Sequence, residues 1–140
     1  MGLFTKKNKV DRSVKSFLVG LLNNNCSDVK SLIEGDRGDQ RINLSIVVAL
    51  IPLENDQPNT DQAHTVVTRD FSSSGVSIIL EKPVGFDLAI LAFRFDGMMK
   101  YFKAEARHLN PMGGGFYSLG FQLLEETYPG DYPALESIHF

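Results

Sequence analysis

Apolar residues recur at helical spacing near the start of the chain. Intervals of three and four positions mark one face of a helix, and between residues 11 and 25 they separate Val14, Phe17, Leu18, Leu21 and Leu22. Ser13 suits the N-cap because its hydroxyl can accept a hydrogen bond from an unpaired backbone N–H. The pattern predicts a short amphipathic helix whose apolar face packs into a core. The alternative is a face that docks on a partner protein or on a second copy of the chain.

A second helical segment is expected directly after the first. Ser27 suits its N-cap, Val29, Leu32 and Ile33 share one face, and Gly35 suits a left-handed end. The stretch "EGDRGDQR" that follows predicts a loop, since glycine and charged residues dominate it.

From residue 42 onward the apolar period changes from helical spacing to two. Alternation of this kind, rich in β-branched side chains, is typical of a strand with one face in a core, and it is formed by Ile42, Leu44, Ile46, Val48 and Leu50. Pro52 has no backbone N–H to donate to a ladder, so it predicts the end of this strand.

Further strand patterns follow at short intervals, namely "HTVVTRDF", "VSIIL", "FDLAILAFRF", "MKYFKAEARHL" and "FYSLGFQLL". The turn "SSSG" separates the first two, and the Asp-Gly pair in "FDGM" indicates a hairpin. Because no helical pattern is long enough for repeated parallel crossovers, the order favours an antiparallel barrel or sandwich. We expect an all-β small barrel with a short N-terminal helical extension.

The composition is that of one globular domain. The 140 residues are 43% hydrophobic and 22% charged, which is enough apolar material for a single core. We expect a helical extension over residues 1–35, a barrel domain over residues 36–125, and an acidic C-terminal tail over residues 126–140.

Charge and cysteine content narrow the function classes. A net charge of −3 argues against a general nucleic-acid binder, because such binders neutralise phosphates with clustered Lys and Arg. The single cysteine, Cys26, rules out an intrachain disulfide and fits a reducing compartment. The start "MGLFTKKNK" lacks a signal-peptide core, and no run of about 18 apolar residues is present. We therefore expect a cytoplasmic protein with neither a membrane nor a nucleic-acid partner.

Two arginines, Arg37 and Arg41, stand four residues apart in "RGDQR", just before the first strand pattern. The planar guanidinium fork can donate to two phosphate oxygens at once and keeps its charge near neutral pH. The same fork matches the O6 and N7 acceptors of guanine, and its flat face stacks on bases. The pair predicts a clamp for a phosphorylated purine.

The stretch "RDFSSSG" supplies complementary acceptors. The N1 and N2 edge of guanine donates hydrogen bonds, so the carboxylate of Asp70 and the hydroxyl of Ser72 suit it. By strand alternation Asp70 and Ser72 should face outward while Phe71 enters the core, and Arg69 should face away from Asp70. Gly75 is expected to supply the positive φ of a tight turn.

At these residues the chain resembles the PilZ domain family, bacterial receptors for the second messenger cyclic di-GMP. The family signature is R-x-x-x-R on an N-terminal loop, followed by Asp/Asn-x-Ser-x-x-Gly about thirty residues later. Here the two parts are "RGDQR" and "DFSSSG", and "YSLGF" is similar to the family's closing strand.

The resemblance implies a six-stranded antiparallel barrel with the ligand on its outer surface. It implies that Arg37 and Arg41 contact phosphates and guanine edges of one cyclic di-GMP or an intercalated pair, and that Asp70, Ser72 and Gly75 form the barrel side of the site. The expected function is a sensor without a cofactor, in which binding orders the arginine loop and a downstream protein partner reads the change. A homodimer is compatible with this function.

Catalytic and metal-dependent functions are not expected. His64, His108 and His139 show no metal-ligand spacing, and "SSSG" lacks the setting of an activated serine. The principal alternative is an adaptor that keeps the PilZ-like barrel and binds proteins without nucleotide. A third, an oligonucleotide-binding barrel, is disfavoured by the acidity of the chain.

Overall fold

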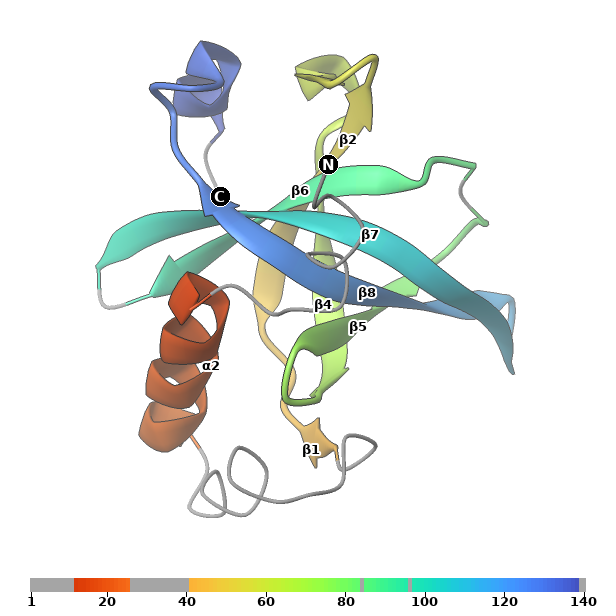
Figure 1. Ribbon diagram of the computed structural model, residues 1–140. Coiled ribbons are helices and arrows are strands. Elements are labelled where there is room, and N and C mark those ends of the chain that lie inside the picture. The colour runs from red at the N-terminus through yellow and green to blue at the C-terminus, as the bar shows by residue number, and fades with distance from the viewer. Residues whose placement is uncertain (1–11, 26–40, 84, 96, 139–140) are drawn as a thin grey trace, which may run out of the picture.

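A closed barrel of antiparallel strands dominates the structure, a computed structural model that describes residues 12–25, 41–83, 85–95 and 97–138 (Figure 1). Its elements are α2 (Arg12–Asn25), β1 (Ile42–Asn43), β2 (Val47–Glu54), β3 (Gln57–Pro58), η1 (Thr60–Gln62), β4 (His64–Phe71), β5 (Gly75–Leu80), β6 (Leu88–Phe95), β7 (Met98–Gly113), β8 (Phe116–Thr127) and η2 (Pro133–Ser137), where η denotes a 3-10 helix. The second helical segment predicted at residues 27–35 lies outside the described residues.

Six strands close the barrel. The hydrogen-bonded order is β4-β5-β8-β7-β6-β2, and β2 returns to pair with β4, so that each of the six has two neighbours. Every pairing is antiparallel, and the short strands β1 and β3 extend β4 and β2 at their ends. The predicted fold, an all-β six-stranded antiparallel barrel with an N-terminal helix, is confirmed, and it is the barrel that the PilZ resemblance implies.

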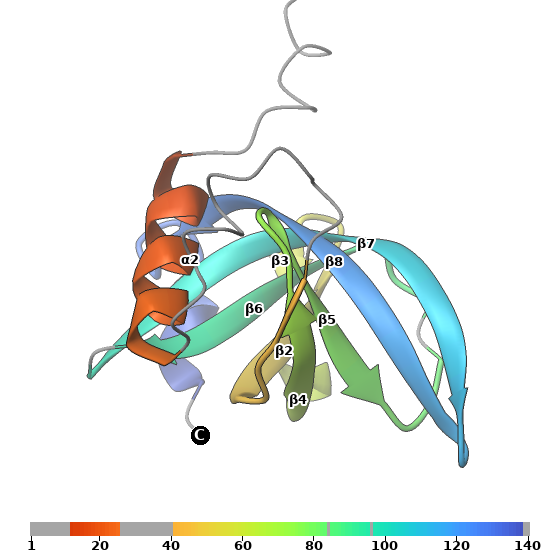
Figure 2. The ribbon, with the colours of Figure 1, turned by 90° about the horizontal axis from the view of Figure 1, so that it is seen from below.

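The helix α2 belongs to the core of the barrel. Its residues Val14, Phe17, Leu18 and Leu21 are buried in the same apolar cluster as inward-facing residues of the strands. The ring of Phe17 lies 4.8 Å from that of Phe93 and 4.6 Å from that of Phe102, centroid to centroid. Figures 1 and 2 show α2 beside the strands, and in Figure 1 it lies below β7 and β8 whereas η2 lies above them. The prediction of a core-packing helix face is confirmed for these four residues, and the side chain of Leu22 lies outside the described part of the chain.

The strand predicted from residue 42 is interrupted, and it does not end at Pro52. In the gap between β1 and β2, the hydroxyl of Thr68 in β4 donates to the carbonyl of Leu44 at 2.7 Å and accepts from the N–H of Ile46 at 2.9 Å. Pairing of β2 with β4 ends at Leu50, so Pro52 lies where the missing N–H faces no β4 partner, and β2 continues to Glu54.

The outer face of β2 is also buried, because the C-terminal segment packs against it. A second apolar cluster consists of Ala49, Ile51, Leu53, Ile90, Ala92, Tyr101 and Leu135. Leu135, which lies in η2 within the acidic tail predicted from composition, has no exposed surface. Burial raises the pKa of Tyr132 beside this cluster, and the nearby carboxylate of Asp56 raises it further. Tyr132, Leu135 and Ile138 therefore contribute to the packing of the barrel.

The part of the chain that the structure describes contains no helix long and apolar enough to span a membrane.

Substituting Phe17→Ala tests whether α2 is integral to the barrel. We expect a loss of about 3–5 kcal/mol of unfolding free energy, since a buried ring is removed and a cavity is left. Urea denaturation followed by circular dichroism measures this. Lys15→Ala, on the exposed face of the same helix, should change stability by less than about 0.5 kcal/mol. Equal effects of the two substitutions would show that α2 does not belong to the core.

Candidate functional site

The outward position of Asp70 depends on a bulge in β4. Thr68 pairs with Ile78 and Asp70 pairs with Ser77, so Arg69 is an extra residue with no partner of its own in the ladder with β5. An extra residue reverses the alternation of side chains beyond it. Thr68 and Phe71 are therefore both fully buried. Asp70 then emerges on the outer surface next to Arg69.

The expectation that Arg69 faces away from Asp70 is wrong for this reason. Its Nε lies 3.9 Å from Oδ2 of Asp70, on the same side of the strand. Strict alternation fails here because it holds only in a regular ladder, and the bulge occurs at Arg69 itself.

Arg41 and Asp70, one from each predicted motif, are in direct contact. A guanidinium nitrogen of Arg41 donates to Oδ1 of Asp70 at 2.8 Å, and the side chains are 48% and 12% exposed. β1, which begins at Ile42, pairs with the end of β4 and so holds Arg41 beside Asp70. The structure thus brings the two motifs together. Arg37 lies outside the described residues.

Ser72 and Gly75 form the turn between β4 and β5. The N–H of Ser72 donates to the carbonyl of Gly75 at 2.9 Å, and the N–H of Gly75 donates to Oγ of Ser72 at 3.1 Å. The hydroxyl of Ser72 therefore has a structural role as an acceptor, and its own hydrogen remains a group that can donate to a ligand. Asp70 and Ser72 are each only 9% exposed, so they form the floor of a site rather than a projecting surface.

The prediction that Gly75 supplies the positive φ of a tight turn is wrong. The described glycines with positive φ are Gly97, Gly113, Gly114 and Gly115, and Gly75 is not among them. A Cβ at position 75 would instead lie 2.5 Å from the carbonyl oxygen of Phe121, which is backbone of β8. Glycine is needed here because β5 and β8 approach closely beside the turn.

These residues line a polar pocket of about 210 Å³ on the barrel surface, together with residues of β7 and β8. Its lining is Arg41, Ser72, Ser74, Gly75, Val76, Ser77, Arg107, His108, Gly120, Phe121 and Gln122. Asp70 borders it through its contact with Arg41. Three of the five residues predicted for the site, Arg41, Ser72 and Gly75, are thus found in one pocket.

Sequence reasoning missed Arg107 and His108. They lie in β7, far along the chain from both motifs, and both are exposed although they are adjacent. The ladder between β7 and β8 shifts register between Ala106 and His108, which turns adjacent side chains to the same surface. A guanidinium nitrogen of Arg107 lies 3.0 Å from a carboxylate oxygen of Glu105. Both basic residues are visible in the stretch "EARHL". The surface to which their side chains point could not be predicted, because it depends on the register between β7 and β8.

The pocket has the chemistry of an anion site with a hydrogen-bonding floor. Arg41, which precedes β1, and Arg107 of β7 supply guanidinium donors to the lining, and Ser72 and Ser74 of the turn line the same pocket. Across the described residues no group of His, Cys, Asp or Glu is arranged to hold a metal ion. The geometry suits recognition of a phosphorylated ligand by charge-assisted hydrogen bonds.

A closed barrel with the two motifs joined at one surface pocket is the arrangement that the PilZ resemblance implies. No protein-family model and no curated protein matches the chain. A solved structure similar to it is that of the inhibitor of motility from Bacillus subtilis, MotI/DgrA. The similarity has a TM-score of 0.46 with 16% sequence identity, and it covers 68% of this chain and 45% of that one, so the chain spans less than half of the protein it matches.

Substituting Gly75→Ala tests the close approach of β5 and β8. We expect a loss of about 1–3 kcal/mol in the free energy of unfolding, because the added methyl group meets backbone that cannot move aside easily. Chemical denaturation measures the loss. Gly130→Ala is the matched control, since a Cβ there meets nothing within 4 Å. A Gly75→Ala protein as stable as the control would contradict the steric role.

Proposed function

We propose that this chain is a receptor for cyclic di-GMP that has no catalytic activity. The observation that supports the proposal best is the contact between Arg41 and Asp70 at a pocket also lined by Ser72 and Gly75. Four of the five predicted ligand contacts therefore lie at one place on the barrel, although the chain separates the two motifs.

Arg41 can bind a phosphate without giving up its contact with Asp70. The guanidinium group has five N–H donors in a fixed plane, and the contact with Asp70 is made by one nitrogen. The remaining donors can form a charge-assisted pair with a phosphate oxygen. Asp70 thereby fixes the direction in which the fork points.

Asp70 and Ser72 suit the guanine edge. Oδ2 of Asp70 lies 3.9 Å from Nε of Arg69, which is longer than a hydrogen bond, so this oxygen can accept from guanine N1 or N2. The hydroxyl of Ser72 can donate to a neighbouring acceptor of the ligand. Arg107 adds a second cation to the lining of the pocket.

The proposal includes a route for the signal. Arg37 contacts the ligand, and binding orders the loop that carries it, so that a downstream protein partner reads the new arrangement. The helix α2 packs in the core, so the element that changes is the segment between α2 and β1. The ligand is one cyclic di-GMP or an intercalated pair, and a homodimer is compatible with either.

The alternative function is a protein-interaction adaptor that binds no nucleotide. It is favoured by the fact that the site residues satisfy one another: Asp70 accepts from Arg41, and Ser72 accepts from Gly75. Such pairs stabilise a turn without any ligand.

Calorimetric titration with cyclic di-GMP distinguishes the two functions. For a receptor we expect a dissociation constant of about 1 μM or below, close to −8 kcal/mol, with no comparable heat from GTP. Arg41→Ala should weaken binding at least about 10-fold, because a charge-assisted hydrogen bond contributes about 1.5–3 kcal/mol. Arg94→Ala, an exposed arginine of β6 outside the pocket, is the matched control. Absence of heat from the unmodified chain would favour the adaptor.

A second pair of variants tests the contribution of β7. Arg107→Ala should weaken cyclic di-GMP binding about 2- to 10-fold, as expected when one partly exposed contact of about 0.5–1.5 kcal/mol is removed. Glu105→Gln removes the carboxylate that lies 3.0 Å from Arg107, so binding should be unchanged or tighter. The same titration reads both variants, and weaker binding by both would mean that the pair acts only by supporting the strand.

A further inference from the structure

The strands β4 and β5 separate at one end. Their ladder reaches Val67, which pairs with Ile79, and goes no further. β4 continues beyond this point along β2, as far as His64 opposite Leu50, and β5 continues along β8 as far as Leu80 opposite Tyr117. Beyond this point β4 is paired only with β2, and β5 is paired only with β8. The edges of β4 and β5 that face each other are unpaired.

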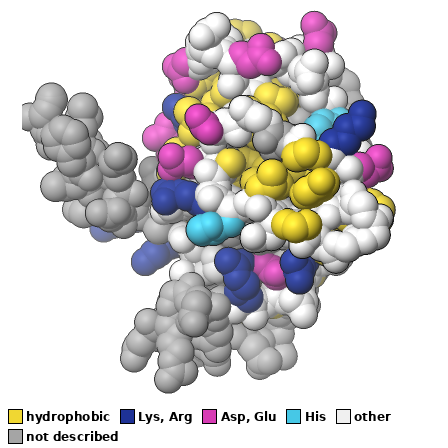
Figure 3. Space-filling view, turned by 90° about the vertical axis from the view of Figure 1, so that its right-hand side faces the viewer, with side chains coloured by type: hydrophobic (Ala, Val, Ile, Leu, Met, Phe, Trp, Pro, Cys, Tyr) yellow, Lys and Arg dark blue, Asp and Glu magenta, His cyan; other side chains and the backbone are white. Residues whose placement is uncertain are grey.

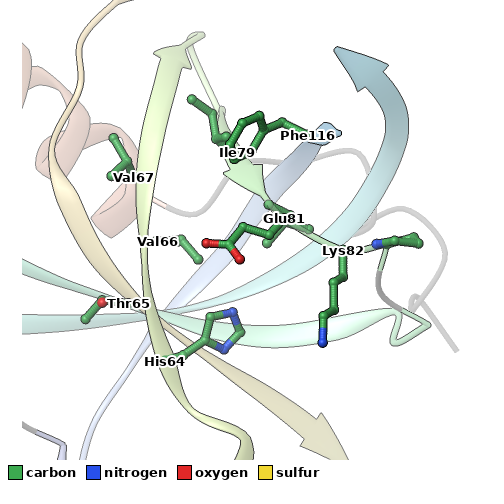
Figure 4. Close-up of a pocket in the computed structure, with 10 residues that line it drawn as sticks. His64, Thr65, Val66, Val67, Ile79, Glu81, Lys82 and Phe116 are labelled. Carbon is green, nitrogen blue, oxygen red and sulfur yellow. The ribbon is translucent and has the colours of Figure 1, made fainter. Parts of the chain in front are cut away.

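A cleft of about 680 Å³ lies between these two edges (Figure 4). One wall is β4 from His64 to Val67, and the other is the end of β5 with residues 81–83. Figure 4 shows Phe116 beside Ile79 at one end of the cleft, and the charged ends of Glu81 and Lys82 toward His64 at the other. The cleft is separate from the polar pocket, and no residue lines both.

The backbone of β4 presents hydrogen-bonding groups to this cleft. The N–H of Thr68 donates to the carbonyl of Ile46, on the β2 side of the strand. Backbone groups alternate between the two edges of a strand, so those of Thr65 and Val67 point to the β5 side. Val67 is the last residue with a β5 partner. Thus no strand in the described part of the chain pairs with Thr65 on the cleft side.

The surface beside the cleft is apolar. Val47, Val67 and Ile79 are consecutive cross-strand partners on β2, β4 and β5. Val47 is 53% exposed, Val67 42%, and Phe116 at the β7–β8 turn 45%. Figure 3 shows hydrophobic side chains gathered on this side of the molecule, with basic and acidic side chains around the gathering. An apolar surface with a polar rim is typical of a binding site for protein.

The charges at the cleft restrict the occupant. Lys82 and Glu81 are exposed at one end, so their formal charges cancel. A polyanion gains little from such a site, whereas a peptide strand can place an apolar side chain against Val67, as cross-strand pairs do.

We propose that this cleft binds an extended peptide segment of a partner protein, which adds a strand to the unpaired edge of β4. Main-chain hydrogen bonds to Thr65 fix the direction of the peptide, and an apolar side chain packs between Val67 and Phe116. This site goes beyond the proposed receptor function and does not depend on nucleotide binding.

Selection of random linear peptides displayed on phage against the full chain tests the proposal. We expect enriched sequences with apolar residues at alternate positions. Val67→Arg should weaken binding of the most enriched peptide, made by synthesis, at least about 10-fold, because a long charged side chain then occupies the cleft. Met98→Arg, a 61% exposed apolar position that does not line the cleft, should leave binding unchanged.

Two further measurements keep the test decisive. Phe116→Ala, an exposed position at a hairpin turn, should also weaken the peptide if Val67→Arg fails to fold. Hydrogen exchange followed by NMR should show slower exchange of the Thr65 amide when peptide is bound. The proposal is overturned by a selection without enrichment, by binding that is insensitive to both variants, or by binding that leaves the Thr65 amide unprotected. Dimerisation of the free chain that Val67→Arg abolishes would assign the cleft to a second copy and would also overturn it.

Discussion

The pairing of β4 with two neighbours at once is the constraint on which the rest of the structure depends. β2 and β5 lie on either side of β4, and the pairing of β4 with β2 closes the barrel. The hydroxyl of Thr68 joins β1 and β2 to the same strand through two hydrogen bonds of 2.7 and 2.9 Å. Because Thr68 is fully buried, loss of that hydroxyl would leave the carbonyl of Leu44 and the N–H of Ile46 without their partner. The position of Arg41, immediately before β1, follows from this connection.

Much of the fold was predictable because periodicity reports which side chains face a core. The helical face of α2 and the positions of the strands along the chain were read from spacing and turn residues, and the contact of Arg41 with Asp70 agrees with the two-motif resemblance. What sequence could not give depends on contacts between distant segments. The bulge at Arg69 needs the register with β5, the space at Gly75 needs the backbone of β8, and the burial of Leu135 needs the outer face of β2. Local propensity contains none of these distances.

The contact between Arg41 and Asp70 is a weak contributor to stability. Arg41 is 48% exposed, and a pair with one solvated partner contributes about 1 kcal/mol or less. Its importance is geometric, since it restricts the rotamers of a long side chain that otherwise loses up to about 2 kcal/mol of conformational freedom when a ligand fixes it. A partly preorganised arginine loses less on binding, which is the general advantage of a preformed site. The same contact in an adaptor would have only its small stabilising effect.

The barrel and the proposed signal make different demands on β4. Along Val67 to Phe71 the strand is held by β5 on one side, and by β2 and β1 in turn on the other. Strands paired on both edges resist displacement, so a ligand that contacts Asp70 has little means of moving the strand. Coupling between two sites requires an element with two arrangements that each site biases differently. Arg41 is exposed and precedes β1, so under the proposed receptor function a ligand would act through this arginine, with the barrel as the fixed side of the site.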